Sequence, residues 1–308
     1  MSTFYILLAF LAGCGLPLQA AANARLGKTL ASPFSAAGLQ LGIAAALLFV
    51  LALATGEIRA MDRLAQAEWW QLSAGLASAA YVVAGIFLFP RLGAVATVGL
   101  FIAGQALASL MLDGFGLFGI ARRVPGPLAW LGTACVAIGI VLIVRGQRRV
   151  AEAGRLATKA AWIALGALCG ALLPVQGALN AALARTAGAP LAVSFTSFMV
   201  AAAGMAIVLL AVIGLGIGAR PRLAGVGSMP WWGWLGGPVG AAYVTTVFMA
   251  MPVIGAAATV GFTIAGQQIV SMLIDRFGWL GLPRNAVSRV RLAGTMVLLA
   301  GVVSIKLF

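Results

Sequence analysis

Two pairs of amide side chains are the groups of this sequence best suited to binding a small molecule. Gln19 and Asn23 stand four residues apart, and Gln176 and Asn180 repeat that spacing in the second half of the chain. Residues four apart share one face of a helix, so each pair presents two amides to one side. An amide both donates and accepts hydrogen bonds, which suits a neutral or mixed polar ligand. The alternative use of both pairs is hydrogen bonding between transmembrane helices, without any ligand.

Two tyrosines and three further glutamines extend the set of candidates. Tyr81 and Tyr243 lie in the middle of long apolar runs, where a phenol needs a hydrogen-bonding partner or a cavity to line. Gln105 lies half-way along another apolar run of the first half, beside an Ala-Gly step. Gln267 and Gln268, which are neighbours in sequence, lie at the same place in the second half. We therefore predict that the substrate-binding site is drawn from nine residues: Gln19, Asn23, Tyr81, Gln105, Gln176, Asn180, Tyr243, Gln267 and Gln268.

Groups that could perform catalysis or bind a metal are scarce by comparison. The chain has no histidine, which is the commonest metal ligand and proton relay. Its cysteines, Cys14, Cys135 and Cys169, lie singly within apolar runs and form no CxxC spacing. The apolar runs also contain no paired carboxylates and no nucleophile beside a base. We therefore expect no enzyme activity, no metal and no cofactor.

The repeated polar residues at the ends of apolar runs have simpler interpretations. Asp113 and Asp275 follow two of these runs and have arginines nearby, so we expect interfacial ion pairs in preference to proton coupling. Thr97 and Thr259 begin the same two runs and are expected to hydrogen-bond to their own backbone. The nearby arginines are Arg122, Arg123, Arg276 and Arg284.

The composition places these residues in a membrane protein. Of 308 residues, 63% are hydrophobic and 8% are charged, and the mean hydropathy is +1.09. Soluble domains have roughly 45–50% apolar and about 25% charged residues, so this chain lies outside the soluble range. The 20 Lys and Arg residues give a net charge of +14 but are scattered between apolar runs. That scatter is typical of loop charges that meet membrane lipid, and it does not predict nucleic-acid binding.

Ten apolar runs are long enough to cross a bilayer as helices, since about 20 residues are needed. Tryptophans stand near the starts of several runs, as is typical of the interfacial belt. Pro17, Pro174 and the run 236–238 can interrupt helices to line a cavity, or can serve close packing as Gly166 and Gly170 do. The predicted spans are 4–24, 34–55, 69–90, 93–112, 127–145, 161–183, 191–217, 231–251, 255–274 and 290–307.

The two halves of the chain repeat one another. The run PLQAAANARLGKTLASP at 17–33 returns as PVQGALNAALARTAGAP at 174–190, and PRLGAVATVG at 90–99 returns as PVIGAAATVG at 252–261. We predict a five-helix repeat at 1–147, a basic cytoplasmic linker at 148–159 and a second repeat at 160–308. Because five is odd, the second repeat must be inverted in the membrane, as in many secondary transporters. The fold class is therefore all-α transmembrane, and we expect a monomer that acts as a fused pseudo-dimer.

These motifs resemble a known family of bacterial inner-membrane proteins. The pattern Gly-x-x-x-Pro-x-Gln-x-x-x-Asn at 13–23 and 170–180 is similar to that of the YdcZ-like family, as are GAVATVG/GAAATVG and AGQ…LD-x-FG-x-x-G. This family resembles the drug/metabolite transporter superfamily. The resemblance implies a fused pair of five-helix units, without naming a substrate. It also implies that Gln19 and Gln176 occupy the place of an essential carboxylate in small multidrug resistance exporters.

The orientation in the membrane has two interpretations. The linker segment RGQRRVAEAGRLATK at 145–159 is strongly basic, which predicts a cytoplasmic linker and both termini outside. Arg59, Arg63, Arg122 and Arg123 oppose this orientation. Ten-helix carriers of the drug/metabolite transporter superfamily usually keep both termini in the cytoplasm. The resemblance therefore also disagrees with an orientation that places both termini outside.

Taken with the repeat, these features predict a secondary transporter. We expect an exporter that moves a small organic molecule across the bacterial inner membrane by alternating access between the repeats. The alternative is a passive small-solute channel, or a structural membrane module that transports nothing. A ring of charges is absent, so a selective ion filter has no obvious source.

Overall fold

The chain forms a bundle of long helices. The computed structural model describes residues 2–92, 94–123, 126–145, 156–216, 221–222, 224–281 and 288–306, and no β-strand occurs among them. The long helices are α1 (Ser2–Leu30), α2 (Pro33–Ala54), α5 (Ala74–Leu92), α6 (Ala94–Phe115), α7 (Pro127–Arg145), α8 (Leu156–Ala187), α9 (Pro190–Gly214), α10 (Gly236–Ile254), α11 (Ala256–Phe277) and α12 (Arg289–Lys306). Short helical turns are α3 (Met61–Leu64) and α4 (Trp69–Leu72), with 3-10 turns at Glu57–Ala60, Leu117–Gly119, Val226–Ser228, Trp231–Trp234 and Trp279–Gly281.

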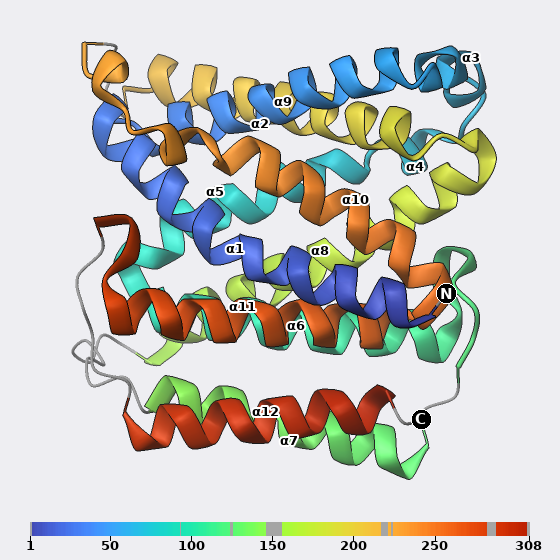
Figure 1. Ribbon diagram of the computed structural model, residues 1–308. Helices are drawn as coiled ribbons and strands as arrows, with labels where there is room; N and C mark the ends of the chain where they lie inside the picture. The colour runs from blue at the N-terminus through green and yellow to red at the C-terminus, as the bar shows by residue number, and fades with distance from the viewer. Residues whose placement is uncertain are drawn as a thin grey trace.

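The long helices are arranged in layers that run side by side (Figure 1). α2 and α9 pack together at one side of the bundle, and α7 and α12 pack together at the other. The remaining six long helices lie between these two pairs. α1 begins and α12 ends at the right edge of the view, whereas α7 ends and α8 begins at the left edge.

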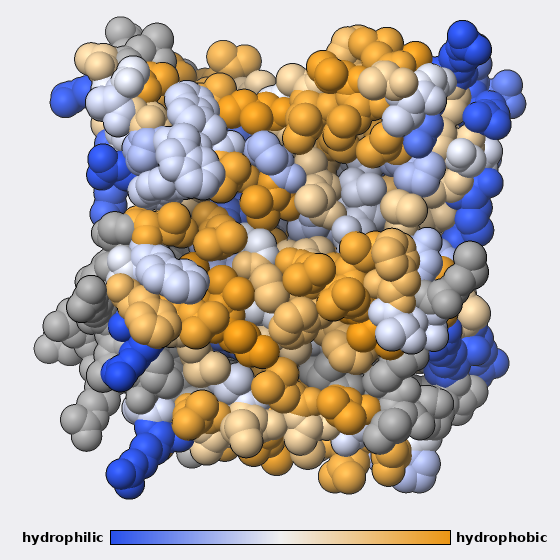
Figure 2. Space-filling view, in the orientation of Figure 1, coloured by the Kyte–Doolittle hydropathy of each residue, from blue (hydrophilic) through white to orange (hydrophobic). Residues whose placement is uncertain are grey.

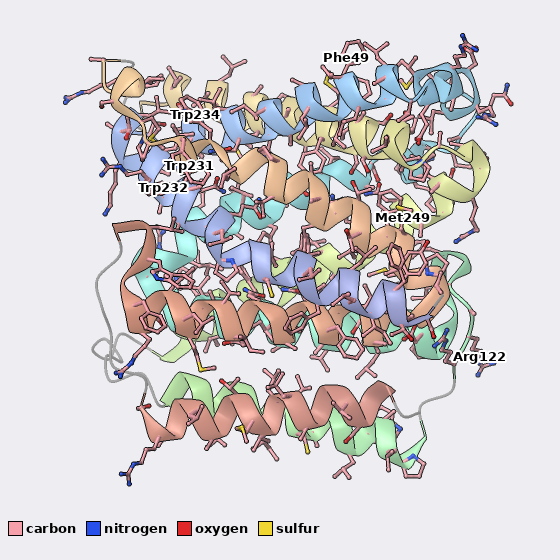
Figure 3. All side chains as sticks on the ribbon, viewed as in Figure 1. Phe49, Arg122, Trp231, Trp232, Trp234 and Met249 are labelled. Carbon is pink, nitrogen blue, oxygen red and sulfur yellow. The ribbon has the colours of Figure 1, made fainter. Side chains whose placement is uncertain are left out.

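The surface matches a protein that spans a bilayer. In the view of Figure 2, apolar side chains cover the middle of the face, and the strongly hydrophilic ones gather at its left and right edges. Trp231, Trp232 and Trp234 lie at one of these edges, and Arg122 lies at the other (Figure 3). The apolar belt between two polar edges follows the hydrocarbon layer, and the tryptophans stand at its boundary.

Eight of the described helices are long and apolar enough to cross a membrane. They cover the first four and the sixth to ninth predicted spans. The apolar stretches of α7 and α12, Pro127–Gly139 and Leu292–Gly301, are shorter. Ten crossings therefore stay a prediction, whereas an all-helical membrane fold is what the structure shows.

Several predicted helix ends are corrected by local geometry. The predicted span 69–90 is divided into α4 and α5, and the span 231–251 begins as a 3-10 turn before α10. Of the two interpretations of Pro17 and Pro174, the interruption does not occur, because both prolines lie inside continuous helices. The predicted linker 148–159 lies mostly outside the described residues, and its end, 156–159, is the start of α8.

Glycines allow the central helices to approach closely, as the packing interpretation predicted. A Cβ atom at Gly170 of α8 would collide with the backbone of Phe101 in α6. A Cβ atom at Gly13 of α1 would collide in the same way with the backbone of Thr263 in α11. Small residues at such crossings let two transmembrane backbones pack directly against each other. Gly13 and Gly170 are equivalent in the sequence repeat, and so are Phe101 and Thr263.

Other contacts follow the sequence repeat in the same manner. α1 packs against α10 and α11, and α8 packs against α5 and α6. α10 and α11 stand in the second half where α5 and α6 stand in the first. Each half therefore inserts its first helix between the third and fourth helices of the other half.

Candidate substrate-binding site

The amide pair of the second half is part of a closed hydrogen-bond cluster. The Ser78 hydroxyl of α5 donates to Gln176 Oε1 over 2.8 Å. Gln176 Nε2 and Asn180 Nδ2 then donate to the Ser197 hydroxyl of α9, over 3.4 and 3.2 Å. Gln176 is 2% exposed and Asn180 is 0% exposed. Side chains from three helices thus satisfy most of this buried polar group, although Asn180 Oδ1 has no partner among the described residues.

The equivalent pair of the first half has no such cluster. Gln19 is half-buried, and its side chain makes no hydrogen bond with the described part of the chain. Asn23 is half-buried as well, and its Oδ1 is buried without a described partner. Buried polar groups are nearly always hydrogen-bonded. Asn23 Oδ1 and Asn180 Oδ1 are alike in having no described partner, so it is the Gln19 side chain that distinguishes the first half from the second.

The difference has two causes in the surrounding helices. Gly240 of α10 stands where α5 has Ser78, so no hydroxyl reaches Gln19 from that side. Gln40 of α2 stands where α9 has Ser197, and its amide is already bonded to the start of α10. Gln40 Nε2 donates to the Gly233 carbonyl over 2.8 Å, and Gln40 Oε1 accepts from the Gly237 N–H over 2.6 Å.

Two glycines of α10 bring its backbone close to the side chains of Gln19 and Asn23. A Cβ atom added at Gly240 would lie 2.7 Å from Gln19 Nε2. A Cβ atom added at Gly236 would collide with Asn23 Oδ1. Both amides therefore lie directly on the surface of α10, and the start of α10 serves close packing in the way the sequence allowed.

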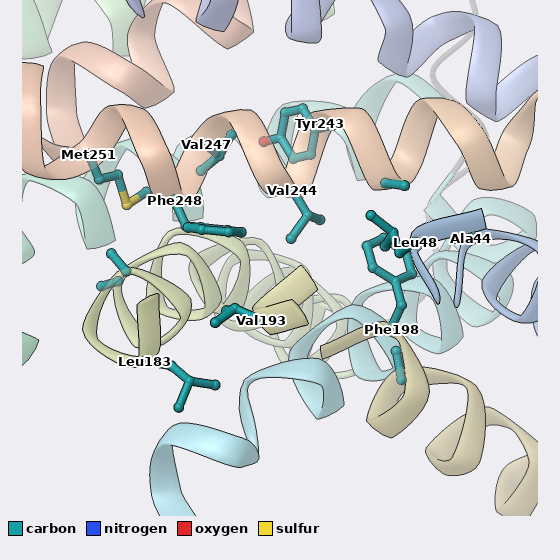
Figure 4. Close-up of a cluster of buried hydrophobic side chains, with 14 of the residues drawn as sticks. Ala44, Leu48, Leu183, Val193, Phe198, Tyr243, Val244, Val247, Phe248 and Met251 are labelled. Atoms are coloured by element: carbon teal, nitrogen blue, oxygen red, sulfur yellow. The ribbon is translucent and has the colours of Figure 1, made fainter. Parts of the chain in front are cut away.

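The structure places the two predicted tyrosines at the centre of the bundle. Tyr81 packs against Phe101, with the ring centres 4.4 Å apart and the ring planes tilted by 40°. Tyr243 is 5% exposed and lies near the Thr263 side chain, whose hydroxyl donates to the Val260 carbonyl over 2.8 Å. Tyr243 joins an apolar cluster at which α2, α8, α9 and α10 meet (Figure 4). Phe101 and Thr263 are equivalent positions, so the tyrosine of the second half again has the more polar neighbour.

The three other glutamines do not form a network. Gln105 is 2% exposed, Gln268 is buried, and Gln267 is half-buried. None of them makes a side-chain hydrogen bond within the residues that the structure describes. Their place in a substrate-binding site stays a prediction.

The threonines at the starts of α6 and α11 behave differently from each other. Thr259 Oγ1 donates to the Gly255 carbonyl over 2.7 Å, which confirms the expected bond to its own backbone. Thr97 is fully buried, and its hydroxyl has no partner among the described residues. Gly93, the residue equivalent to Gly255, lies outside the described residues, so the same bond stays a prediction there.

Asp113 caps a helix instead of forming the expected ion pair. Its carboxylate accepts hydrogen bonds from the backbone N–H groups of Ala256 and Ala257, over 2.7 and 2.8 Å, at the start of α11. Arg123 donates to the carbonyls at the end of α10, including that of Ile254 over 3.0 Å. Helix N-termini have unpaired N–H groups and a positive partial charge, so a carboxylate is stabilised there. Arg284, one of the arginines expected to lie near Asp275, is outside the described residues.

A second acid has the same role, and the sequence analysis missed it. Glu57 Oε2 accepts from the N–H groups of Leu191 and Ala192, over 2.7 and 3.4 Å, at the start of α9. The residue before α9, Ala189, supplies no side-chain cap of its own. Both acids belong to the first half and cap helices of the second half.

The chain matches one known family over most of its length. The family described as "Putative inner membrane exporter, YdcZ" matches residues 4–142 and again residues 161–304. The chain belongs to this family. The YdcZ family thus matches once in each half, which agrees with the internal repeat and confirms the family to which the motifs pointed.

One relative and one solved structure agree with this membership. Inner membrane protein YdcZ of Escherichia coli (strain K12) is 32% identical over 149 residues, which are 47% of this chain and 94% of that protein. A crystal structure of a protein at 21% sequence identity has a TM-score of 0.70 and covers 99% of this chain and 96% of that chain. That likeness shows a shared fold. With eight membrane-length apolar helices among the described residues, this YdcZ-family chain is a multi-pass protein of the inner membrane.

Proposed function

We propose that the chain is a secondary transporter that exports a small polar organic molecule by alternating access between two inverted five-helix halves. The observation that carries this proposal is the exchange of equivalent contacts, in which α1 packs on α10 and α11 while α8 packs on α5 and α6. Because the contacts of the two halves are equivalent, each half can adopt the conformation that the other half now has. Such an exchange would open the centre of the bundle first to one side of the membrane and then to the other. The proposal includes ten crossings, with α7 and α12 as the fifth and tenth.

Contacts between the halves support a state that is closed at one edge. Glu57 and Asp113 bind the starts of α9 and α11, and Arg123 binds the end of α10. Arg185 of the second half donates to the Phe118 carbonyl of the first half. All of these residues lie at the edge at which α1 begins (Figure 1). Alternating access requires these contacts to break when that edge opens.

The orientation that we propose keeps the basic linker in the cytoplasm and both termini outside. α7 ends and α8 begins at the edge opposite to the start of α1, in keeping with an odd number of crossings in each half (Figure 1). Single cysteines at Ser2 and at Arg148, in a chain without its native cysteines, should be labelled from opposite sides of the membrane. Labelling of both positions from the same side would contradict this topology.

A reversible disulfide cross-link between the two halves, at the edge where α1 begins, tests alternating access. In the same cysteine-free background, Asp113→Cys with Ala256→Cys places two thiols where the carboxylate now meets the helix start. Oxidation should stop saturable solute flux in proteoliposomes, and reduction should restore it. Each single-cysteine variant is the matched control for the loss of the cap. Full flux in the cross-linked protein, or flux that never saturates with solute concentration, would instead support a passive pore.

A further inference from the structure

Of the two amide pairs, the pair of the first half keeps more unfilled hydrogen-bonding capacity in the described chain, although Asn180 Oδ1 of the other pair is unpartnered as well. Gln176 donates and accepts within the cluster of Ser78 and Ser197, so little of its capacity is left for a ligand. Gln19 keeps its whole amide, with two N–H donors and one carbonyl acceptor, and it is only half-buried. Asn23, one turn further along α1, adds the acceptor Oδ1.

The surroundings explain why no protein group fills this capacity. Gly240 offers no side chain, and Gln40 is held by Gly233 and Gly237 at the start of α10. Neither Gln19 nor Asn23 forms an ion pair or a hydrogen bond with a charged side chain in the described chain. No charged side chain of the described chain therefore occupies these amides, and a partner that fills both of them must supply donors and an acceptor.

We infer that Gln19 and Asn23 recognise a primary carboxamide or urea group of the transported molecule, and that Gln176 and Asn180 are structural. This inference rests on the proposed transport function. A primary carboxamide can pair head-to-tail with the Gln19 amide, giving one N–H to Gln19 Oε1 and accepting from Gln19 Nε2. Its second N–H is left to donate to Asn23 Oδ1. The ligand thereby supplies to Gln19 the hydrogen bonds that Ser78 and Ser197 supply to Gln176.

The same complementarity excludes the acid that corresponds to the amide. A carboxylate has no N–H to give, so it would place a negative oxygen against the oxygens of Gln19 and Asn23. Sites built to bond a ligand N–H discriminate strongly against an analogue that lacks it, because the buried acceptors are then left unpaired. Nicotinamide and nicotinate are therefore matched probes, since they share a ring and differ in this group alone.

Two equivalent substitutions test the assignment with each half as the control for the other. Purified wild-type protein in detergent should bind nicotinamide and not nicotinate, as measured by calorimetry. Gln19→Ala should weaken nicotinamide binding by about tenfold or more, because two ligand hydrogen bonds are lost, and should leave the melting temperature near that of the wild type. Gln176→Ala should lower the melting temperature and leave the affinity of the folded fraction within about twofold.

A third variant keeps the test decisive if Gln176→Ala does not fold. Gly240→Ser puts a Cβ atom 2.7 Å from the present position of Gln19 Nε2 and adds the hydroxyl that Gln176 already has. The flexible Gln19 side chain should shift to bond that hydroxyl, so nicotinamide binding should weaken while the protein stays folded. Ser78→Ala removes one hydrogen bond from the closed cluster and should leave nicotinamide affinity unchanged.

The possible results separate the inference from the transport function. Equal losses of affinity in Gln19→Ala and Gln176→Ala would overturn the one-sided site. Absence of nicotinamide binding to the wild type, or equal binding of nicotinate, would overturn the carboxamide assignment. If nicotinamide binds as described but proteoliposomes show no saturable flux of it, the recognition site stands and the proposed transport function fails.

Discussion

The amide pair on α1 and the amide pair on α8 occupy equivalent positions and have different surroundings. Around Gln176, two serines from α5 and α9 complete a buried network. Around Gln19, Gly240 replaces the first serine, and Gln40 replaces the second. The Gln40 amide is already hydrogen-bonded to the start of α10. Only two neighbouring positions have diverged, yet one pair is closed by the protein and the other is left open. A duplicated chain can therefore keep one copy of a motif for stability while the other copy becomes available to a ligand.

The largest effect should come from breaking the closed network at its shared acceptor. Ser197→Val leaves Gln176 Nε2 and Asn180 Nδ2 without a partner in a region that is almost fully buried. Two unsatisfied buried groups should lower the free energy of unfolding by about 2–4 kcal/mol. Denaturant unfolding in detergent measures this change.

The control for this substitution lies on the surface. Ser304→Ala on exposed α12 removes a hydroxyl that bonds only to its own helix, at Ala300, and should change stability by less than about 0.5 kcal/mol. Equal stability of Ser197→Val and Ser304→Ala would show that the second amide pair is not held by its network.

An intermediate effect should distinguish how the equivalent helices α2 and α9 begin. α2 is capped locally, because Ser32 Oγ accepts from the Ser35 N–H over 3.2 Å, whereas α9 relies on Glu57 from the other half. Glu57→Ala should lower the free energy of unfolding by about 1–2 kcal/mol, since it removes a charged cap. The exposed acid variant Asp62→Ala is the control and should have almost no effect. Thermal unfolding that is unchanged in Glu57→Ala would contradict a cap supplied by the other half.

The smallest expected change in stability comes from removing the hydroxyl groups of Tyr243 and Tyr81. Tyr243→Phe removes a hydroxyl that has Thr263 as its neighbour and should lower the free energy of unfolding by about 0.5–1 kcal/mol. Tyr81→Phe keeps the ring that packs at a tilt against Phe101, and it should cost less than Tyr243→Phe. A larger loss of stability in Tyr81→Phe than in Tyr243→Phe would reverse the ranking of the two halves at this position.

The sequence was sufficient for the elements and the family, and insufficient for the contacts between helices. Apolar runs of about 20 residues predict most of the long helices, because backbone groups in a bilayer must be satisfied within a helix. The spacing of Gln176 and Asn180 predicted a shared helix face. It could not predict Ser78 and Ser197 as their partners, because helix rotation and register decide which side chains meet.

The missed residues left only weak signals in the sequence. Gln40 is a lone amide in an apolar run, and its alignment with Ser197 in the repeat could have marked the position as one at which the halves differ. Glu57 lies in a loop, and its contact with Leu191 spans 134 residues, so no local pattern could reveal it. Asp113 was identified as a repeated acid with arginines nearby, but its bonds to the start of α11 span 143 and 144 residues, so no local pattern could reveal them.

The two acids that cap helices of the opposite half have a consequence for how the protein is made. Glu57 and Asp113 leave the ribosome and enter the membrane before α9 and α11 have been synthesised. When α9 and α11 insert later, the unpaired backbone N–H groups at their starts can bond the carboxylates of Glu57 and Asp113, which are already in the membrane. The first half thus acts as a template for the second during biogenesis, and a second half synthesised alone would insert two helices with uncapped ends.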